Sequence, residues 1–188
     1  MQFPHKTLER NLFKAGYRLI YAVDEVGMGC LAGPVVVCAI GITNIFYKKH
    51  HKKLRRLRES KLLSPHQREK FAGELFSENL VYAISYAYPR TIDKLNIYQA
   101  SRLAMRKAIK KVKPQYDLKS IVLVDGNKKI PGLKSEQIAI TGGDRKVFAI
   151  ACASIIAKVY RDKMMTGYAK KYPGYGFERH KGYGTKYH

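Results

Sequence analysis

The alternation of hydrophobic and polar positions predicts several buried strands separated by helices. Short apolar runs that are rich in Val and Ile are typical of buried strands. They lie at residues 17–24, 34–43, 80–88, 121–124 and 137–141. Apolar residues at helical spacing predict helices at 92–112 and from 144 past 162, and Ser64 followed by Pro65 is typical of a helix start. Because two paired strands come first and strands then alternate with helices, we expect a mixed α/β sheet flanked by helices.

No linker in this pattern separates two domains. The chain has 188 residues, which is the usual length of one domain with a complete core. We therefore assign residues 1–188 to a single domain, whose last part, residues 165–188, is rich in Tyr and Gly. The longest apolar stretch, 34–42, is too short to cross a bilayer, and no signal peptide is evident at the N-terminus. We expect a cytoplasmic, monomeric protein.

The charge of the chain indicates a polyanionic partner. Lys and Arg number 36 against 14 Asp and Glu, which gives a formal net charge of +22. Because neutralising phosphates releases counterions and drives binding, nucleic acid is the expected partner. The alternatives are an anionic membrane surface or a protein that acts as an RNA scaffold, and neither of these needs acids buried at strand ends.

Acidic side chains come directly at the ends of two predicted strands. Asp24 and Glu25 end the first, and Asp125 ends the strand at 121–124. Buried acids are costly unless they are paired or bound to a cation, and successive strand residues point to opposite faces. A divalent metal ion at this edge of the sheet would stabilise all three carboxylates, so the pattern predicts a metal site.

The long helix predicted from 144 onward carries one polar stripe on an otherwise apolar surface. Ser154, Lys158 and Asp162 are spaced four residues apart, so they share one face. We expect this stripe to face the metal site and Asp162 to supply its fourth carboxylate. The alternative is an ordinary Lys–Asp pair on the helix surface. We assign Asp144, at the start of the helix, to its N-cap.

Four carboxylates in a basic protein indicate hard divalent cations. Mg²⁺ and Mn²⁺ prefer oxygen ligands and keep positions open for water and phosphate. Two such ions about 4 Å apart can activate a water and stabilise the leaving oxygen. The sequence therefore predicts phosphodiester hydrolysis with Mg²⁺ or Mn²⁺ in a two-metal mechanism.

Several segments resemble the ribonuclease HII (type 2 ribonuclease H) family, and they follow one another in the family's order. They are residues 22–27 (AVDEVG), 31–36 (LAGPVV), 60–64 (SKLLS), 92–97 (IDKLNI), 123–127 (LVDGN), 153–162 (ASIIAKVYRD) and 180–186 (HKGYGTK). The resemblance implies a ribonuclease H-like fold. It also implies a metal-dependent endonuclease that cuts on the 5′ side of a ribonucleotide and leaves 3′-hydroxyl and 5′-phosphate ends. The implied substrates are RNA–DNA hybrids and duplex DNA with embedded ribonucleotides.

The resemblance also implies roles for individual residues. The catalytic acids and metal ligands would be Asp24, Glu25, Asp125 and Asp162. The family reads the RNA–DNA junction with a Gly-Arg-Gly loop and a tyrosine, which correspond here to residues 27–29 and Tyr183. The candidate substrate-binding residues are Gly27, Met28, Gly29, Lys61, Ser154, Lys158 and Tyr183. The segment 165–188 would then contact substrate.

The junction loop departs from the family at one position. Met28 replaces the family's arginine, so a charged contact with several donors is lost. Gly27 and Gly29 still permit close approach of the backbone to nucleic acid. We expect an intact metal site with altered junction recognition. One alternative is a hybrid-binding protein of the same fold with weak catalysis, and another is a metal-dependent exonuclease, which would release single nucleotides from free ends.

Overall fold

The computed structural model describes residues 7–50, 63–112 and 118–188. Five strands form one mixed sheet in the order β3-β2-β1-β4-β5. β1 pairs antiparallel with β2, and β2 with β3, whereas β1–β4 and β4–β5 are parallel. The strands are β1 (Leu19–Val26), β2 (Val35–Thr43), β3 (Val81–Ala87), β4 (Ser120–Asp125) and β5 (Glu136–Ile140). The predicted mixed sheet is confirmed.

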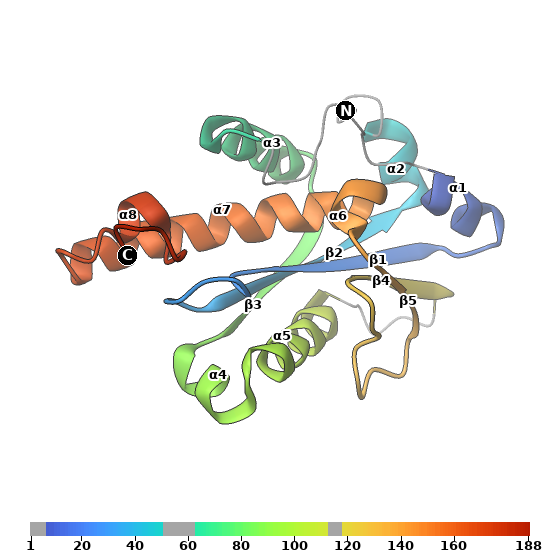
Figure 1. Ribbon diagram of the computed structural model, residues 1–188. Helices are drawn as coiled ribbons and strands as arrows, with labels where there is room; N and C mark the ends of the chain where they lie inside the picture. The colour runs from blue at the N-terminus through green and yellow to red at the C-terminus, as the bar shows by residue number, and fades with distance from the viewer. Residues whose placement is uncertain (1–6, 51–62, 113–117) are drawn as a thin grey trace.

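Helices cover both faces of the sheet (Figure 1). They are α1 (Thr7–Lys14), α2 (Asn44–His50), α3 (Pro65–Ser77), α4 (Pro89–Leu95), α5 (Ile97–Val112), α6 (Gly143–Lys146), α7 (Phe148–Lys171) and α8 (Phe177–His180). α7 lies across one face together with α1, α2 and α3, and α4 and α5 lie on the other (Figure 1). Among the described residues, we find no helix with the length and apolar character needed to span a membrane.

Two predicted helices are each divided in the structure. The helix predicted at 92–112 is split at Asn96, which has a φ of 65° and accepts a hydrogen bond of 3.0 Å from the Gln99 amide at the start of α5. The helix predicted from 144 is split at Val147, whose extended backbone separates α6 from α7. Because of this second break, Asp144 belongs to the short helix α6 and not to α7. α7 continues to Lys171, so it contains the beginning of the Tyr- and Gly-rich segment.

The central strand β1 is buried on both faces, which determines where its last residues point. Ile20 and Ala22 pack in the apolar cluster with α7, whereas Tyr21 and Val23 pack in the cluster with α5. Because successive side chains alternate between the two faces of a strand, the next residue, Asp24, is directed toward α7. Its neighbour Glu25 is directed toward α5.

Candidate carboxylate site

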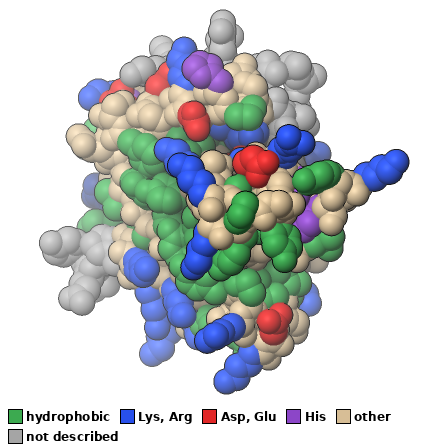
Figure 2. Space-filling view, turned by 90° about the vertical axis from the view of Figure 1, so that its left-hand side faces the viewer, with side chains coloured by type: hydrophobic (Ala, Val, Ile, Leu, Met, Phe, Trp, Pro, Cys, Tyr) green, Lys and Arg blue, Asp and Glu red, His purple; other side chains and the backbone are tan. Residues whose placement is uncertain are grey.

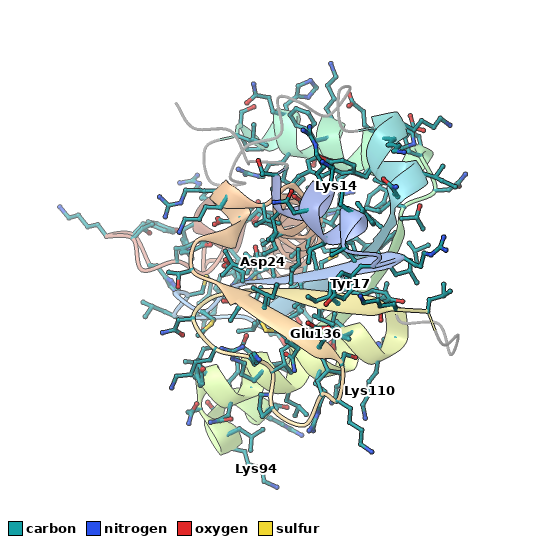
Figure 3. The ribbon with its side chains drawn as sticks, turned by 90° about the vertical axis from the view of Figure 1, so that its right-hand side faces the viewer. Lys14, Tyr17, Asp24, Lys94, Lys110 and Glu136 are labelled. Carbon is teal, nitrogen blue, oxygen red and sulfur yellow. The ribbon has the colours of Figure 1, made fainter. Side chains whose placement is uncertain are left out.

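A hollow of about 210 Å³ lies where β1 and β4 end. Figure 3 shows Asp24 between the sheet and the helices on one of its faces. The hollow is lined by Asp24, Glu25, Val26, Gly27, Met28, Gly29, Asp125, Asp144, Ser154, Lys158 and Tyr183. The structure therefore brings together most of the residues that the sequence predicted for the site. Lys61 lies outside the described residues.

The two adjacent acids of β1 have different surroundings because they point to opposite faces of the sheet. Asp24 is 4% exposed, and its Oδ1 accepts a hydrogen bond of 2.8 Å from the Glu25 amide. Burial raises the pKa of Asp24 well above its ordinary value, the negative charges of Glu25 and Asp125 raise it further, and a hydrogen bond from Ser154 of α7 opposes them. The alternation of β1 thus gives Asp24 a polar partner on α7.

Glu25 lies on the α5 side of the sheet and is partly buried. Burial raises its pKa to about 7, the charge of Asp125 adds to the shift, and the charge of Arg102 on α5 opposes it. Its Oε2 atom is buried and has no hydrogen-bond partner among the described residues. A buried carboxylate oxygen without a partner is costly, and a cation ligated at this position would satisfy it.

Asp125 and Asp144 are connected through the turn that follows β5. Asp125 Oδ1 accepts a hydrogen bond of 2.6 Å from the Gly143 amide. A Cβ atom on Gly143 would lie 2.5 Å from Ile150 Cδ1 and 3.1 Å from this oxygen, so a larger residue there would require the Ile150 side chain to move. Burial raises the pKa of Asp125, and so does the charge of Asp144. Asp144 therefore belongs to the same electrostatic cluster.

The position of Asp144 differs from the one that its sequence context predicted. The N-cap of α6 is Gly142, and Asp144 lies inside the first turn, so the assignment of Asp144 to an N-cap is wrong. β5 runs parallel to β4 and β1, and the carboxyl ends of parallel strands meet at one edge of a sheet. A strand at 136–140 followed by Thr-Gly-Gly-Asp was the signal in the sequence that could have identified Asp144.

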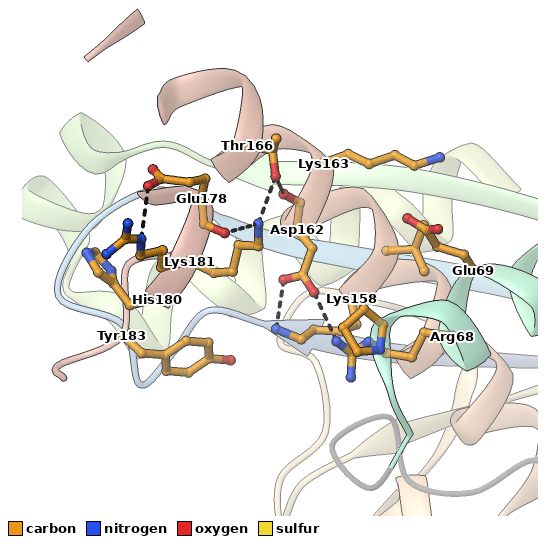
Figure 4. Close-up of a pocket in the computed structure, with 13 residues that line it drawn as sticks. Arg68, Glu69, Lys158, Asp162, Lys163, Thr166, Glu178, His180, Lys181 and Tyr183 are labelled. Atoms are coloured by element: carbon orange, nitrogen blue, oxygen red, sulfur yellow. Dashed lines mark hydrogen bonds and ion pairs between the residues drawn. The ribbon is translucent and has the colours of Figure 1, made fainter. Parts of the chain in front are cut away.

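Asp162 does not line the hollow with the other acids. Its Oδ1 accepts a hydrogen bond of 2.8 Å from Lys158 Nζ, and its Oδ2 lies 3.4 Å from Arg68 Nη2 on α3. These contacts lie in a neighbouring pocket of about 600 Å³ between α3, α7 and α8 (Figure 4). The charge of Asp144, by contrast, helps to raise the pKa values of Asp24, Glu25 and Asp125. Asp162 is in a Lys–Asp–Arg ion-pair group.

Lys158 and Tyr183 connect the two pockets, since both residues line both of them. Lys158 Nζ lies 5.1 Å from the centroid of the Tyr183 ring, and its bond to Asp162 fixes its position between the pockets. Ser154, one turn earlier on α7, lies at Asp24. The polar stripe of α7 therefore faces the site with Ser154 and Lys158.

The loop of residues 27–29 forms part of the wall of the hollow. Gly27 has a φ of 114°, and a Cβ atom on it would lie 2.6 Å from Arg161 Nε, so glycine is required. Nothing lies within 4 Å of a Cβ atom on Gly29. Met28 is partly buried and packs against the apolar cluster of α5, so the loop presents no cationic side chain to the hollow at this position.

The face around α8 and the β1–β2 loop is predominantly basic. Lys and Arg side chains project around a hydrophobic middle, and few acidic side chains are seen there (Figure 2). Leu31, in the loop, is 76% exposed. A basic face with exposed apolar groups beside a carboxylate hollow suits a phosphate backbone that approaches the acids.

The carboxylates fit divalent cations by their chemistry. The described residues contain no group of three or more His, Cys, Asp or Glu side chains already arranged around one ion position. Burial first, and then neighbouring negative charges, raise the pKa values of Asp24, Glu25 and Asp125, so a bound cation would stabilise their charged forms. Oxygen donors and uncompensated negative charge are the features that Mg²⁺ and Mn²⁺ sites share.

Comparisons with known proteins identify a family for this arrangement. A family model described as Ribonuclease HII matches residues 22–188. Ribonuclease HII of Caldicellulosiruptor saccharolyticus is 46% identical over 181 residues, which cover 96% of this chain and 83% of the relative. Ribonuclease HII of Endomicrobium trichonymphae is 44% identical over 182 residues, with 97% and 82% covered. The crystal structure of ribonuclease H2 from Pyrococcus horikoshii OT3 superposes with a TM-score of 0.70 at 27% identity, covering 89% of this chain and 82% of that one.

Proposed function

Since the chain belongs to the ribonuclease HII family, we propose that it cuts the phosphodiester bond on the 5′ side of a ribonucleotide, leaving 3′-hydroxyl and 5′-phosphate ends. Family membership makes it an endoribonuclease that acts on RNA–DNA hybrids and implies a divalent metal ion. The proposal extends this activity to single ribonucleotides embedded in duplex DNA. We also propose that the protein acts as a monomer.

The observation that carries the proposal is the convergence of four acids at the ends of three parallel strands. Asp24, Glu25, Asp125 and Asp144 line one hollow, and the negative charges of Asp125 and Asp144 help to raise the pKa values of their neighbours Asp24 and Glu25. Asp144 takes the place for which the sequence suggested Asp162. These four residues would hold Mg²⁺ or Mn²⁺, which, when bound as a pair, supply an activated water and neutralise charge on the leaving oxygen.

The other residues of the hollow would bind and orient the substrate. Lys158 presents its ammonium group between the acids and Tyr183, where it would contact a phosphate. Ser154 holds Asp24 by a hydrogen bond. The backbone at Glu25 and the open Gly29 allow close approach of a ribose, whose 2′-hydroxyl distinguishes RNA from DNA. Tyr183 would pack on the sugar beside the junction.

Asp162 acts indirectly in this proposal. Its ion pair with Lys158 limits the positions that the ammonium group can take, and its contact with Arg68 connects α7 to α3. Asp162 is thus a positioning residue for Lys158. Met28 offers no donor for a phosphate, so junction recognition rests on the backbone of the loop and on Tyr183, and we propose that it is weaker than in a loop with arginine.

A cleavage assay tests the proposal directly. An end-labelled DNA duplex with one internal ribonucleotide is incubated with the protein and either Mg²⁺ or Mn²⁺, beside an all-DNA duplex. We expect one metal-dependent cut on the 5′ side of the ribonucleotide and none in the all-DNA control. Cleavage of a long RNA–DNA hybrid without cleavage of this duplex would contradict the extension to embedded ribonucleotides. Single-nucleotide products from the ends would indicate an exonuclease.

A further inference from the structure

Arg161 of α7 is fully buried and joins two segments that are far apart in the sequence. Its Nε atom donates a hydrogen bond of 3.0 Å to the Pro34 carbonyl, and Nη2 donates one of 3.0 Å to the Ala32 carbonyl. Its Nη1 atom donates one of 2.7 Å to the Lys181 carbonyl. Within the described part of the chain, it forms no ion pair with a carboxylate. A buried charge that donates these three hydrogen bonds to backbone carbonyls indicates a specific structural task.

The two segments that Arg161 joins are the loop of residues 27–34 and the tail of residues 181–183. They also bind each other: the Leu31 and Ala32 amides donate to the Gly182 carbonyl at 2.9 and 3.3 Å. Cys30 forms an isolated antiparallel bridge with Tyr183. The loop begins with Gly27, Met28 and Gly29, and the tail ends at Tyr183, so each segment carries part of the lining of the carboxylate hollow.

The contact between loop, tail and Arg161 leaves no spare space. A Cβ atom on Gly27 would lie 2.6 Å from Arg161 Nε, and one on Gly182 would lie 2.3 Å from the Ala32 carbonyl oxygen. The Arg161 guanidinium also lies 5.8 Å from the centroid of the Tyr183 ring. Arginine suits this position because its planar fork presents several donors in fixed directions, which a lysine ammonium cannot reproduce.

We propose that Arg161 is a positioning residue that fastens the loop and the tail into one body, so that the loop and Tyr183 meet an RNA–DNA junction together. The inference rests on the proposed function, in which both segments contact the substrate. Arg161 does not line the carboxylate hollow, so the four acids stay in place when the fastening is lost. Recognition of a single ribonucleotide then suffers, while the hydrolytic step on a long hybrid, which offers many equivalent cutting positions, is retained.

The first test separates the tail from the loop without changing the buried arginine. Gly182→Ala places a methyl group against the Ala32 carbonyl, and Gly182 has a φ of 85°. Gly174→Ala is the matched control, since Gly174 has a φ of 90° but nothing within 4 Å of its Cβ position. Both variants carry similar backbone strain, and only Gly182→Ala pushes loop and tail apart.

Both variants are assayed on a duplex with one ribonucleotide and on a long RNA–DNA hybrid with Mg²⁺. For Gly182→Ala we expect KM on the single-ribonucleotide duplex to rise roughly 10-fold or more, with kcat on the hybrid within about twofold of the unaltered protein. Gly174→Ala should match the unaltered protein on both substrates. An equal loss on both substrates for Gly182→Ala, or no loss on either, would overturn the proposal.

The second test changes Arg161 itself and does not depend on cleavage. Arg161→Lys keeps the charge and removes the fork, and hydrogen exchange of the Leu31 and Ala32 amides reports whether loop and tail separate. We expect these amides to exchange faster in Arg161→Lys and Gly182→Ala while those of β1 stay protected. Unchanged exchange would overturn the fastening even if the proposed activity is confirmed. If the unaltered protein fails to cut the single-ribonucleotide duplex, the proposed function is refuted and the exchange experiment still tests Arg161.

Discussion

The Asp125 carboxylate accepts a hydrogen bond of 2.6 Å from the amide of Gly143, and this bond joins the end of β4 to the residue directly before Asp144. β1, β4 and β5 are parallel neighbours, so the acids that follow them gather at one edge of the sheet. Asp144 is therefore placed by the strands rather than by α7. Asp162, which is on α7, is held by Lys158 and Arg68 instead.

Replacing Asp144 should abolish cleavage. Asp144→Asn removes one negative oxygen from the cluster while preserving the size of the side chain, and it weakens the hold on a metal ion. Changes to residues that only support metal ligands already cost roughly 10- to 100-fold in activity or affinity, so we expect at least a loss of that size. Steady-state cleavage of an RNA–DNA hybrid over a range of Mg²⁺ concentrations measures it.

Asp162→Asn is the matched control, because it is the same substitution on the neighbouring acid. We expect its rate to fall by less than roughly tenfold, or about 1.4 kcal/mol. Loss of the partly exposed ion pairs with Lys158 and Arg68 should cost about 1 kcal/mol of stability, or about 2–4 °C in Tm. If Asp162→Asn were inactive and Asp144→Asn active, the assignment of the fourth acid would be reversed.

Asp125→Asn should separate binding from catalysis. The substitution removes a charge from the acids that repel a phosphate backbone, so affinity for a hybrid should stay the same or increase slightly. Cleavage should be lost, because the metal ions would lack a ligand between Asp24 and Asp144. Fluorescence anisotropy with a labelled hybrid measures the affinity, and a cleavage assay on the same hybrid measures the activity. Retained activity would remove Asp125 from the metal site.

Much of this arrangement could be predicted from the sequence, because buried strands and strand-end acids have local signals. Asp24 and Asp125 each directly follow an apolar run, and Glu25 comes next after Asp24. Asp144 does not, since a Gly-Gly turn separates it from its strand and it reads as the beginning of a helix. The parallel pairing of β4 with β5 brings Asp144 to the site, and the strand before the Gly-Gly turn is the only sign of this pairing in the sequence.

Arg161 had no local signal either. In the sequence it is one basic residue among 36 Lys and Arg, and it lies beside the polar stripe of α7. Its three carbonyl partners belong to the β1–β2 loop and to the C-terminal tail. The role of Arg161 depends on how these segments pack around α7. The pattern of apolar residues within α7 does not predict that packing.

We expect Glu25 to make the stability of the metal-free protein depend on pH. Burial raises its pKa from 4.5 to about 7, so the folded protein prefers the protonated form more strongly than the unfolded chain does. The contribution of Glu25 to the free energy of unfolding is complete below the pKa that Glu25 has in the unfolded chain. This contribution is lost as pH rises through about 7, the pKa of Glu25 in the folded protein. With EDTA present, Tm should therefore be higher at pH 5 than at pH 8, and Mg²⁺ should raise Tm more at pH 8.

Calorimetric melting at both pH values, with EDTA and with Mg²⁺, measures this effect. Glu25→Gln is the matched variant, because it cannot ionise and keeps the shape of the side chain. Its Tm in EDTA should depend less on pH between 5 and 8, and its gain from Mg²⁺ should be smaller. If the Tm of the metal-free protein rose from pH 5 to pH 8, the inferred preference of the folded protein for protonated Glu25 would be contradicted.

Binding of nucleic acid should depend steeply on salt, because the chain carries a formal net charge of +22. The logarithm of the association constant should fall linearly with the logarithm of the salt concentration, with a slope near −0.9 for each phosphate neutralised. Lys158→Gln should reduce the slope by about one, since its ammonium group would contact a phosphate. Lys94→Gln, an exposed lysine on α4, is the control that should leave the slope unchanged. A shallow slope for the unaltered protein would argue against a phosphate-dominated interface.

Met28→Arg should improve cleavage of DNA with a single ribonucleotide. The loop keeps Gly27 and Gly29 but has a thioether where the family has a guanidinium, so it lacks donors for a phosphate at the junction. A hydrogen bond to a charged group contributes about 1.5–3 kcal/mol, and we expect KM for this duplex to fall roughly tenfold or more. Kinetics on the duplex and on a long hybrid measure the change in preference.

Met28→Lys distinguishes charge from geometry at this position. Lysine brings the same charge without the planar fork, so it should lower KM less than arginine does if two parallel hydrogen bonds are needed. Equal improvement by both variants would show that charge alone is missing from the loop. No improvement by either would show that the loop already binds the junction through its backbone, together with Tyr183. In that case the packing of Met28 against the α5 cluster would be the reason that methionine is suitable there.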